Sequence, residues 1–121
     1  MKNAIVDAYN QLRIGHPLDE NNHVGPLIDQ DAVKPYLKAL KQVVAEGGKI
    51  VVEGGVLEGT GYESGCYVKP AMAEAEANYE IVQQETFAPI LYLLKYSGDL
   101  ENALTIQNGV VQGLSSAIMT N

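Results

Sequence analysis

Two residues of the stretch QQETFAPILYL, residues 83–93, have side chains suited to holding a sugar and an attached ring. Glu85 and Phe87 lie two positions apart, so on an extended segment both side chains would point to the same face. A carboxylate can accept hydrogen bonds from both hydroxyls of a ribose, and a nearby aromatic ring can pack against the base. On the residues alone, a plainer interpretation is favoured, in which Glu85 caps the start of a strand and Phe87 lies in the core.

Cys66 is the one cysteine of the chain and its only strong nucleophile. A catalytic thiol needs a nearby base, an oxyanion hole and a lowered pKa. Cys66 instead begins the strand-like segment CYVKP, and no histidine is close to it in sequence. We therefore predict that it packs as a small apolar residue. A single cysteine also allows no intrachain disulfide, which fits a reducing compartment.

Three other segments contain atoms that could bind a ligand. His16 and His23 flank two acidic residues in one loop, but they lack the spacing of a metal site, so we predict no metal. The glycines of EGGVLEGTGYESG, residues 53–65, precede neither a helix start nor a Walker lysine, so they are interpreted as turn residues. The acidic run AEAEANYE, residues 73–80, is interpreted as an exposed surface segment.

The first half of the chain contains two predicted helices. Apolar residues at three- and four-residue spacings predict a helix over residues 2–14, and a loop rich in Gly, Pro and Asn follows from residue 15. Asp29 suits the N-cap of a second helix that extends to the glycine pair Gly47–Gly48. The β-branched segment KIVVEGG then predicts a buried strand.

The second half reads mostly as strands. We predict strands within residues 66–72, 79–85 and 89–96, and the last is nearly continuous in apolar residues, so we expect it at the centre of the sheet. Asp99 begins a predicted helix over residues 99–108, and the apolar run of residues 114–120 predicts a final strand. Alternating helices and strands predict an α/β fold. With 121 residues and 46% hydrophobic content, the chain is expected to form one domain.

The charge balance argues against two classes of partner. The 8 basic and 15 acidic residues give a net charge of −7, which repels nucleic-acid phosphates and anionic lipids. No apolar run approaches the roughly 20 residues that span a bilayer, and the first residues contain no signal-peptide core. We therefore expect a soluble, cytoplasmic protein without a nucleic-acid or membrane partner.

Four motifs occur in the order and approximate spacing typical of aldehyde dehydrogenases: GPLID, GCYVKPA, QQETFAPIL and GLSSAIMTN. Together they cover nearly the whole chain, and ETFAP resembles the Glu-x-Phe-Gly-Pro signature of that family, with Ala88 in place of the commoner glycine. ETFAPIL followed by QGLSS is most similar to the antiquitin branch, whose members oxidise α-aminoadipic semialdehyde in lysine catabolism.

The resemblance implies part of an aldehyde dehydrogenase catalytic domain, with helices packed on a short mixed or parallel sheet. Residues 1–121 would then be a single incomplete domain, and the parent enzyme would be a homo-oligomer. Glu85 matches the family glutamate that hydrogen-bonds the nicotinamide ribose, and Phe87 matches the phenylalanine beside the nicotinamide. The cofactor would be NAD or NADP, with NAD favoured.

The same resemblance places no catalytic residue in this chain. In the family, a cysteine thiolate forms a thioester on the way from aldehyde to carboxylate, and Cys66 does not match that cysteine. Ala32 and Pro35 stand where some members have polar residues that contact the ribose, so that role is not transferred. The alternative function is a truncated, non-enzymatic module that acts by protein–protein interaction.

Overall fold

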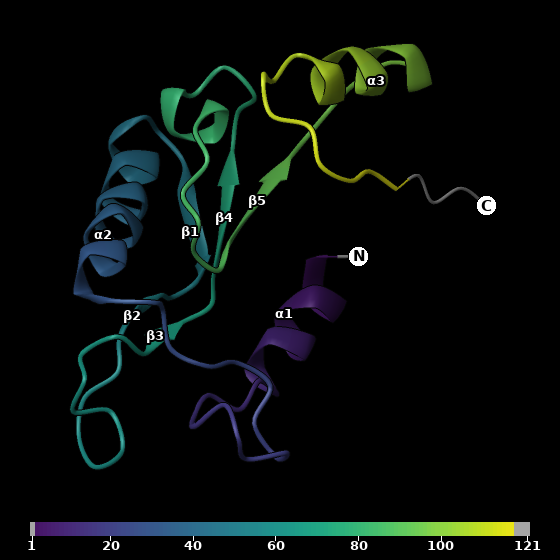
Figure 1. Cartoon of the computed structure of the whole chain (residues 1–121). Coiled ribbons are helices and arrows are strands. Elements are labelled where there is room, and N and C mark those ends of the chain that lie inside the picture. The colour runs from purple at the N-terminus through teal and green to yellow at the C-terminus, as the bar shows by residue number, and fades with distance from the viewer. Residues whose placement is uncertain (1, 118–121) are drawn as a thin grey trace.

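The computed structural model describes residues 2–117, and its centre is a mixed three-stranded sheet. The strands β1 (Lys49–Val52), β4 (Ala71–Ala75) and β5 (Ile90–Leu94) lie in the order β1-β4-β5. β4 pairs antiparallel with β1 and parallel with β5. Helix α2 (Gln30–Ala45) covers one face of this sheet, as Figure 1 shows. The expected arrangement of helices on a short sheet is confirmed, and the sheet is mixed.

The order of the strands corrects two predictions. The centre of the sheet is β4, not the apolar segment of residues 89–96, which forms the edge strand β5. β4 overlaps the start of the acidic run, residues 73–80, that was interpreted as surface, yet Ala73 and Ala75 are buried against α2. Side chains alternate across a strand, so Glu74 points to the opposite face. The small alanine side chains let α2 pack closely on β4. A hydropathy pattern does not reveal this effect of side-chain size.

Helix α2 is confirmed where it was predicted. The Asp29 carboxylate accepts a hydrogen bond from the Ala32 N–H at 2.8 Å, which satisfies a free donor of the first turn. The helix ends before Gly47, whose φ of 103° suits glycine. The helix residues that are buried lie on one side, and they are Val33, Tyr36, Ala39 and Val43.

Two apolar clusters between α2 and the strands make up the core. One joins α2 to β4 and to Ile81. The other joins Val33 and Tyr36 to Val68, with Ala88 packed against it. The Tyr36 hydroxyl is fully buried, donates to the Lys69 carbonyl at 2.6 Å and accepts from the Gly55 N–H at 2.8 Å. It therefore joins the helix to both strands of the second sheet.

That second sheet contains the short antiparallel strands β2 (Gly55–Val56) and β3 (Val68–Lys69). Pro70 separates β3 from β4, so the single strand predicted over residues 66–72 is two. Between β2 and β3, three glycines have positive φ: Gly59, Gly61 and Gly65. Their interpretation as turn residues is confirmed, because only glycine adopts such angles without strain.

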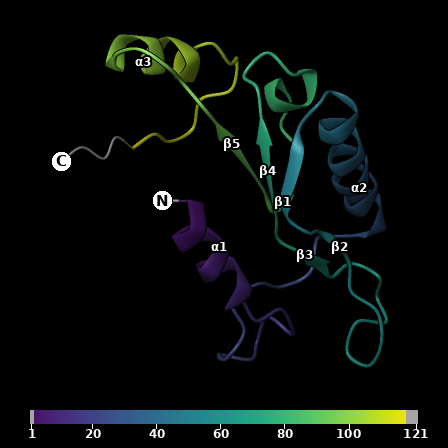
Figure 2. The ribbon, with the colours of Figure 1, turned by 180° about the vertical axis from the view of Figure 1, so that it is seen from behind.

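Helix α1 (Lys2–Asn10) lies on the other side of the sheet from α2, as the two views in Figures 1 and 2 show. It is shorter than the predicted span of residues 2–14, because Ile14 leaves the helix to form a bridge with Val24. None of its residues is buried. The Lys2 ammonium contacts the Glu74 carboxylate at 2.8 Å and so ties α1 to β4.

Among the remaining elements, one predicted helix is confirmed and one predicted strand is replaced by a helical turn. Residues 80–83 form a 3₁₀ turn, η1 (Glu80–Gln83), where a strand was predicted, because the Tyr79 carbonyl accepts from the Val82 N–H at 3.1 Å. Helix α3 (Leu100–Asn108) begins at the predicted cap Asp99 and projects away from the sheet (Figures 1 and 2). Of the final predicted strand, residues 114–117 form none, and residues 118–120 lie outside the described residues. No helix within residues 2–117 is long and apolar enough to cross a membrane.

Candidate functional site

Glu85 and Phe87 lie on the loop of residues 84–89, which joins η1 to β5. Both side chains are exposed, and both line one open hollow of about 400 Å³. Phe87 is 85% exposed, so the interpretation of this residue as a core phenylalanine is wrong. The structure therefore brings the two predicted site residues to a common surface that a ligand can reach.

The backbone of this loop differs from the extended segment on which the prediction was based. Phe87 has a φ of 52°, and it is the only residue other than glycine with a positive φ among residues 2–117. Left-handed backbone costs a residue with a β-carbon about 1–2 kcal/mol. Such strain persists only where the surrounding structure enforces it, and it is concentrated at functional sites. A turn, and not strand alternation, brings Glu85 and Phe87 to the same hollow.

Hydrogen bonds hold the loop at both ends. At its first residue, the Gln84 side chain donates to the Glu80 carboxylate at 2.9 Å. At its last residue, the Pro89 carbonyl accepts from the Ala71 N–H at the start of β4 at 2.9 Å. Ala88, which replaces the commoner glycine of the motif, packs against the core cluster that contains Tyr36. The methyl group of Ala88 therefore helps to seat the loop on the core.

Beneath the loop lie two buried hydroxyls, those of Thr86 and Tyr92. Neither makes a hydrogen bond to any residue that the structure describes. Burial raises the pKa of Tyr92; the Thr86 hydroxyl, at hydrogen-bonding range from it, lowers this pKa, and the negative charge of Glu46 raises it. The Thr86 and Tyr92 side chains are thus neighbours, but their oxygens do not meet the geometry of a hydrogen bond. Sequence analysis missed both residues.

The loop presents a combination suited to a ribose and an aromatic base. Within residues 2–117, the Glu85 carboxylate accepts no hydrogen bond and forms no ion pair, so its lone pairs are available to hydroxyl donors. The exposed ring of Phe87 offers an apolar surface beside it. These two side chains can bind and orient a ligand, but neither is a nucleophile suited to attack an aldehyde.

The other chemically interesting residues have structural roles. Cys66 is buried and unbridged, as predicted for a packing residue. The Nδ1 atom of His16 accepts from the Leu18 N–H at 3.2 Å, and that of His23 accepts from the Arg13 N–H at 3.1 Å. Both histidines therefore fasten their own loop. Residues 2–117 contain no cluster of three or more metal-binding side chains.

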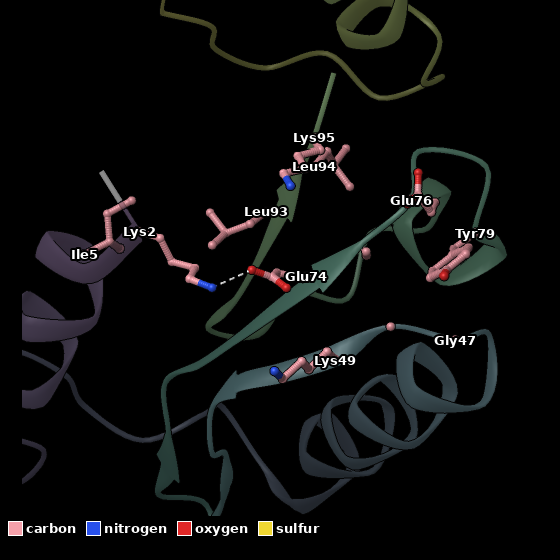
Figure 3. Close-up of a pocket in the computed structure, with 12 residues that line it drawn as sticks. Lys2, Ile5, Gly47, Lys49, Glu74, Glu76, Tyr79, Leu93, Leu94 and Lys95 are labelled. Atoms are coloured by element: carbon pink, nitrogen blue, oxygen red, sulfur yellow. Dashed lines mark hydrogen bonds and ion pairs between the residues drawn. The ribbon is translucent and has the colours of Figure 1, made fainter. Parts of the chain in front are cut away.

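A second hollow, of about 510 Å³, lies between α1 and the face of the sheet opposite α2. Figure 3 shows Lys2 reaching across it to Glu74, with Leu93 beside them on β5. The hydrogen bond from Lys2 lowers the pKa of Glu74. Although this hollow is larger, it lies away from Glu85 and Phe87, so we place the candidate site at the loop.

The Aldehyde dehydrogenase family model matches residues 1–121, the whole chain. The chain belongs to this family. A Caenorhabditis elegans protein described as a putative aldehyde dehydrogenase family 7 member A1 homolog is 47% identical over 93% of the chain and 21% of its own length. The α-aminoadipic semialdehyde dehydrogenase of Mus musculus is 41% identical over 98% of the chain and 22% of its own length.

Solved structures show the same fold. Betaine aldehyde dehydrogenase from Staphylococcus aureus, crystallised in complex with NAD+, superposes with a TM-score of 0.85 and 22% identity over 93% of this chain and 22% of its own chain. HpcC from Thermus thermophilus superposes with a TM-score of 0.82 and 30% identity over 93% of this chain. The chain thus spans about a fifth of the length of the curated relatives that it matches.

Proposed function

We propose that this aldehyde dehydrogenase chain forms the part of the catalytic domain that holds the nicotinamide end of NAD(P). The observation that carries the proposal is the exposure of Glu85 and Phe87 on one hollow, on a loop held at both ends. Glu85 accepts hydrogen bonds from the ribose hydroxyls, and Phe87 packs beside the nicotinamide ring. The family match over the whole chain favours this function over a non-enzymatic interaction module.

The role of the two residues is to orient the cofactor. When bound, the nicotinamide supplies the acceptor for the hydride that leaves the aldehyde carbon. A fixed ribose and a supported ring limit the motion of that acceptor, and orientation of this kind can contribute several kcal/mol to a rate. We propose that the thiolate that forms the thioester lies outside this chain, because buried Cys66 is remote from the loop in sequence and has no histidine partner nearby in sequence.

We further propose that the substrate is α-aminoadipic semialdehyde and that the reaction belongs to lysine catabolism. The similarity to the mouse enzyme of that name supports this assignment. The chain would be one incomplete catalytic domain, which agrees with its coverage of about a fifth of its relatives. NAD is the cofactor that we propose, in line with the family resemblance. A homo-oligomer in the cytoplasm completes the proposal, based on the family resemblance and the single unbridged cysteine.

Segment replacement tests the proposal directly. The matching segment of the mouse α-aminoadipic semialdehyde dehydrogenase is exchanged for these 121 residues, and NADH formation is measured with the semialdehyde. We expect activity, and we expect Glu85→Gln to lower kcat/KM for NAD+ about tenfold or more, since a hydrogen bond to a charged group contributes about 1.5–3 kcal/mol. Glu58→Gln, at an exposed glutamate of the glycine-rich loop, is the matched control. An active hybrid in which Glu85→Gln and Glu58→Gln behave alike would contradict the assignment.

A further inference from the structure

Two unpaired hydroxyls lie beneath the site loop, and a contribution to stability does not explain their presence. The Thr86 Oγ1 and Tyr92 Oη atoms are both buried, and neither has a hydrogen-bond partner among residues 2–117. A buried hydroxyl without a partner destabilises the folded state, and valine or phenylalanine would fill the same space without that cost. Unpaired polar groups of this kind in a folded protein point to a function or to a state in which they become paired.

Their placement connects the rigid sheet to the site. Thr86 is the residue between Glu85 and Phe87, and Tyr92 lies in the middle of β5. Tyr92 packs against the core cluster formed by α2 and β4, so its ring is fixed. Both residues line the hollow that Glu85 and Phe87 share. A contact between the two hydroxyls would therefore act on the one peptide segment that joins the two candidate cofactor residues.

Glu46, the residue that caps the end of α2, uses one carboxylate oxygen to hold the neighbouring elements together. The charge of the Glu46 carboxylate acts on Tyr92, and its Oε1 atom accepts from Gln42 Nε2 at 2.7 Å and from the Ile81 N–H at 3.4 Å. These bonds fasten the end of α2 to η1, and Thr86 is the hydroxyl neighbour of Tyr92 on the loop itself. Because the two side chains are already neighbours, pairing Thr86 with Tyr92 requires only a better alignment of their hydroxyls.

We propose that Thr86 and Tyr92 are positioning residues whose hydroxyls pair when the cofactor is bound. The inference rests on the proposed function of Glu85 and Phe87. The ligand, held by those two side chains, settles the loop against β5, and the Thr86–Tyr92 hydrogen bond then fixes the left-handed backbone at Phe87. Catalytic hydrogen bonds are often long or poorly aligned without ligand and tighten when it binds. The two hydroxyls thus stabilise the loop conformation of the cofactor-bound protein, and they destabilise the free protein, in which they are unpaired.

The proposal predicts opposite effects on stability and on function. In the 121-residue chain, Tyr92→Phe and Thr86→Val should leave the Tm unchanged or raise it, since each removes an unpaired buried hydroxyl. In the segment-replaced dehydrogenase, the same variants should lower kcat/KM for NAD+ by about tenfold or more, as small misplacements of a bound reactant do. Thr86→Ser retains the hydroxyl and should keep parental kinetics.

A double variant and a distant control complete the experiment. Thr86→Val combined with Tyr92→Phe should be no worse than either single change, because both remove the same bond. Tyr62→Phe, which removes a hydroxyl bonded to the Ile14 carbonyl, should leave the kinetics for NAD+ unchanged. Parental kinetics of Tyr92→Phe beside a defective Glu85→Gln would overturn this inference and leave the proposed function intact. A Tyr92→Phe chain with a lower Tm would also overturn it, because the hydroxyl would then be structural. If Glu85→Gln kept parental kinetics, both the proposed function and this inference would be contradicted.

Discussion

Removal of the Tyr36 hydroxyl tests how the core supports the site loop. This hydroxyl is fully buried, donates to the Lys69 carbonyl and accepts from the Gly55 N–H. Burial raises its pKa, so it stays protonated and able to donate at neutral pH. Tyr36 also belongs to the cluster against which Ala88 packs. The Tyr36→Phe variant keeps the ring and removes only the two hydrogen bonds.

The expected loss of stability follows from the two backbone groups left without a partner. An unpaired buried donor or acceptor costs about 1–3 kcal/mol. Water can reach part of this region, because Lys69 is exposed and Gly55 is half-buried. We therefore expect Tyr36→Phe to lower the free energy of unfolding by about 2–3 kcal/mol in total, the lower part of the range for two such groups. That is a large share of the roughly 5–15 kcal/mol of a typical domain.

Urea denaturation of the 121-residue chain measures this loss. The midpoint should fall while the slope stays constant, since the surface exposed on unfolding hardly changes. Tyr96→Phe is the matched control, because that side chain is 57% exposed and forms no hydrogen bond to a described residue. It should change stability by less than about 0.5 kcal/mol. A Tyr36→Phe variant as stable as the Tyr96→Phe control would refute the role of the hydroxyl as a bridge.

Two further predictions concern the core and the α1 contact. Gly54→Ala would press a methyl group against the Tyr36 hydroxyl oxygen. We therefore expect the free energy of unfolding, measured by urea denaturation, to fall by about 1–3 kcal/mol. Gly113→Ala, with open space around it, should be neutral. Lys2→Gln should raise the lowered pKa of Glu74 towards its ordinary value of 4.5, as measured by an NMR titration of the carboxyl group. Since the folded pKa is the lower one, the Lys2–Glu74 contact should stabilise the chain above about pH 4.5 and weaken as the pH falls below it; an unchanged titration in the variant would argue against the contact.

The candidate site residues could be proposed from the sequence, but the geometry of their loop could not be predicted. An acidic residue and an aromatic residue before an apolar strand indicated a loop on which the structure exposes both side chains, because residue types carry chemistry wherever they are placed. The turn at Phe87 was not foreseen, since a positive φ at phenylalanine is enforced by neighbouring structure. Thr86 and Tyr92 were missed for a related reason: a hydroxyl in a sequence gives no sign of whether it is buried or paired.

Local rules determined several elements from the sequence alone. The caps at Asp29 and Asp99 begin the predicted helices, and the glycines between β2 and β3 turn the chain. Each of these features depends on contacts within a few residues, such as a carboxylate and the N–H group three positions later. Their identity and spacing were therefore sufficient.

The tertiary structure alone decided which strand lies at the centre and which face α2 covers. β4 is central because it pairs with β1 before it and with β5 after it, and its alternating alanines accept the helix. The more apolar β5 takes the edge. Strand pairing joins residues far apart in sequence, and its energy depends on the partner as much as on the strand itself. Composition therefore indicated that strands form, while packing determined their order.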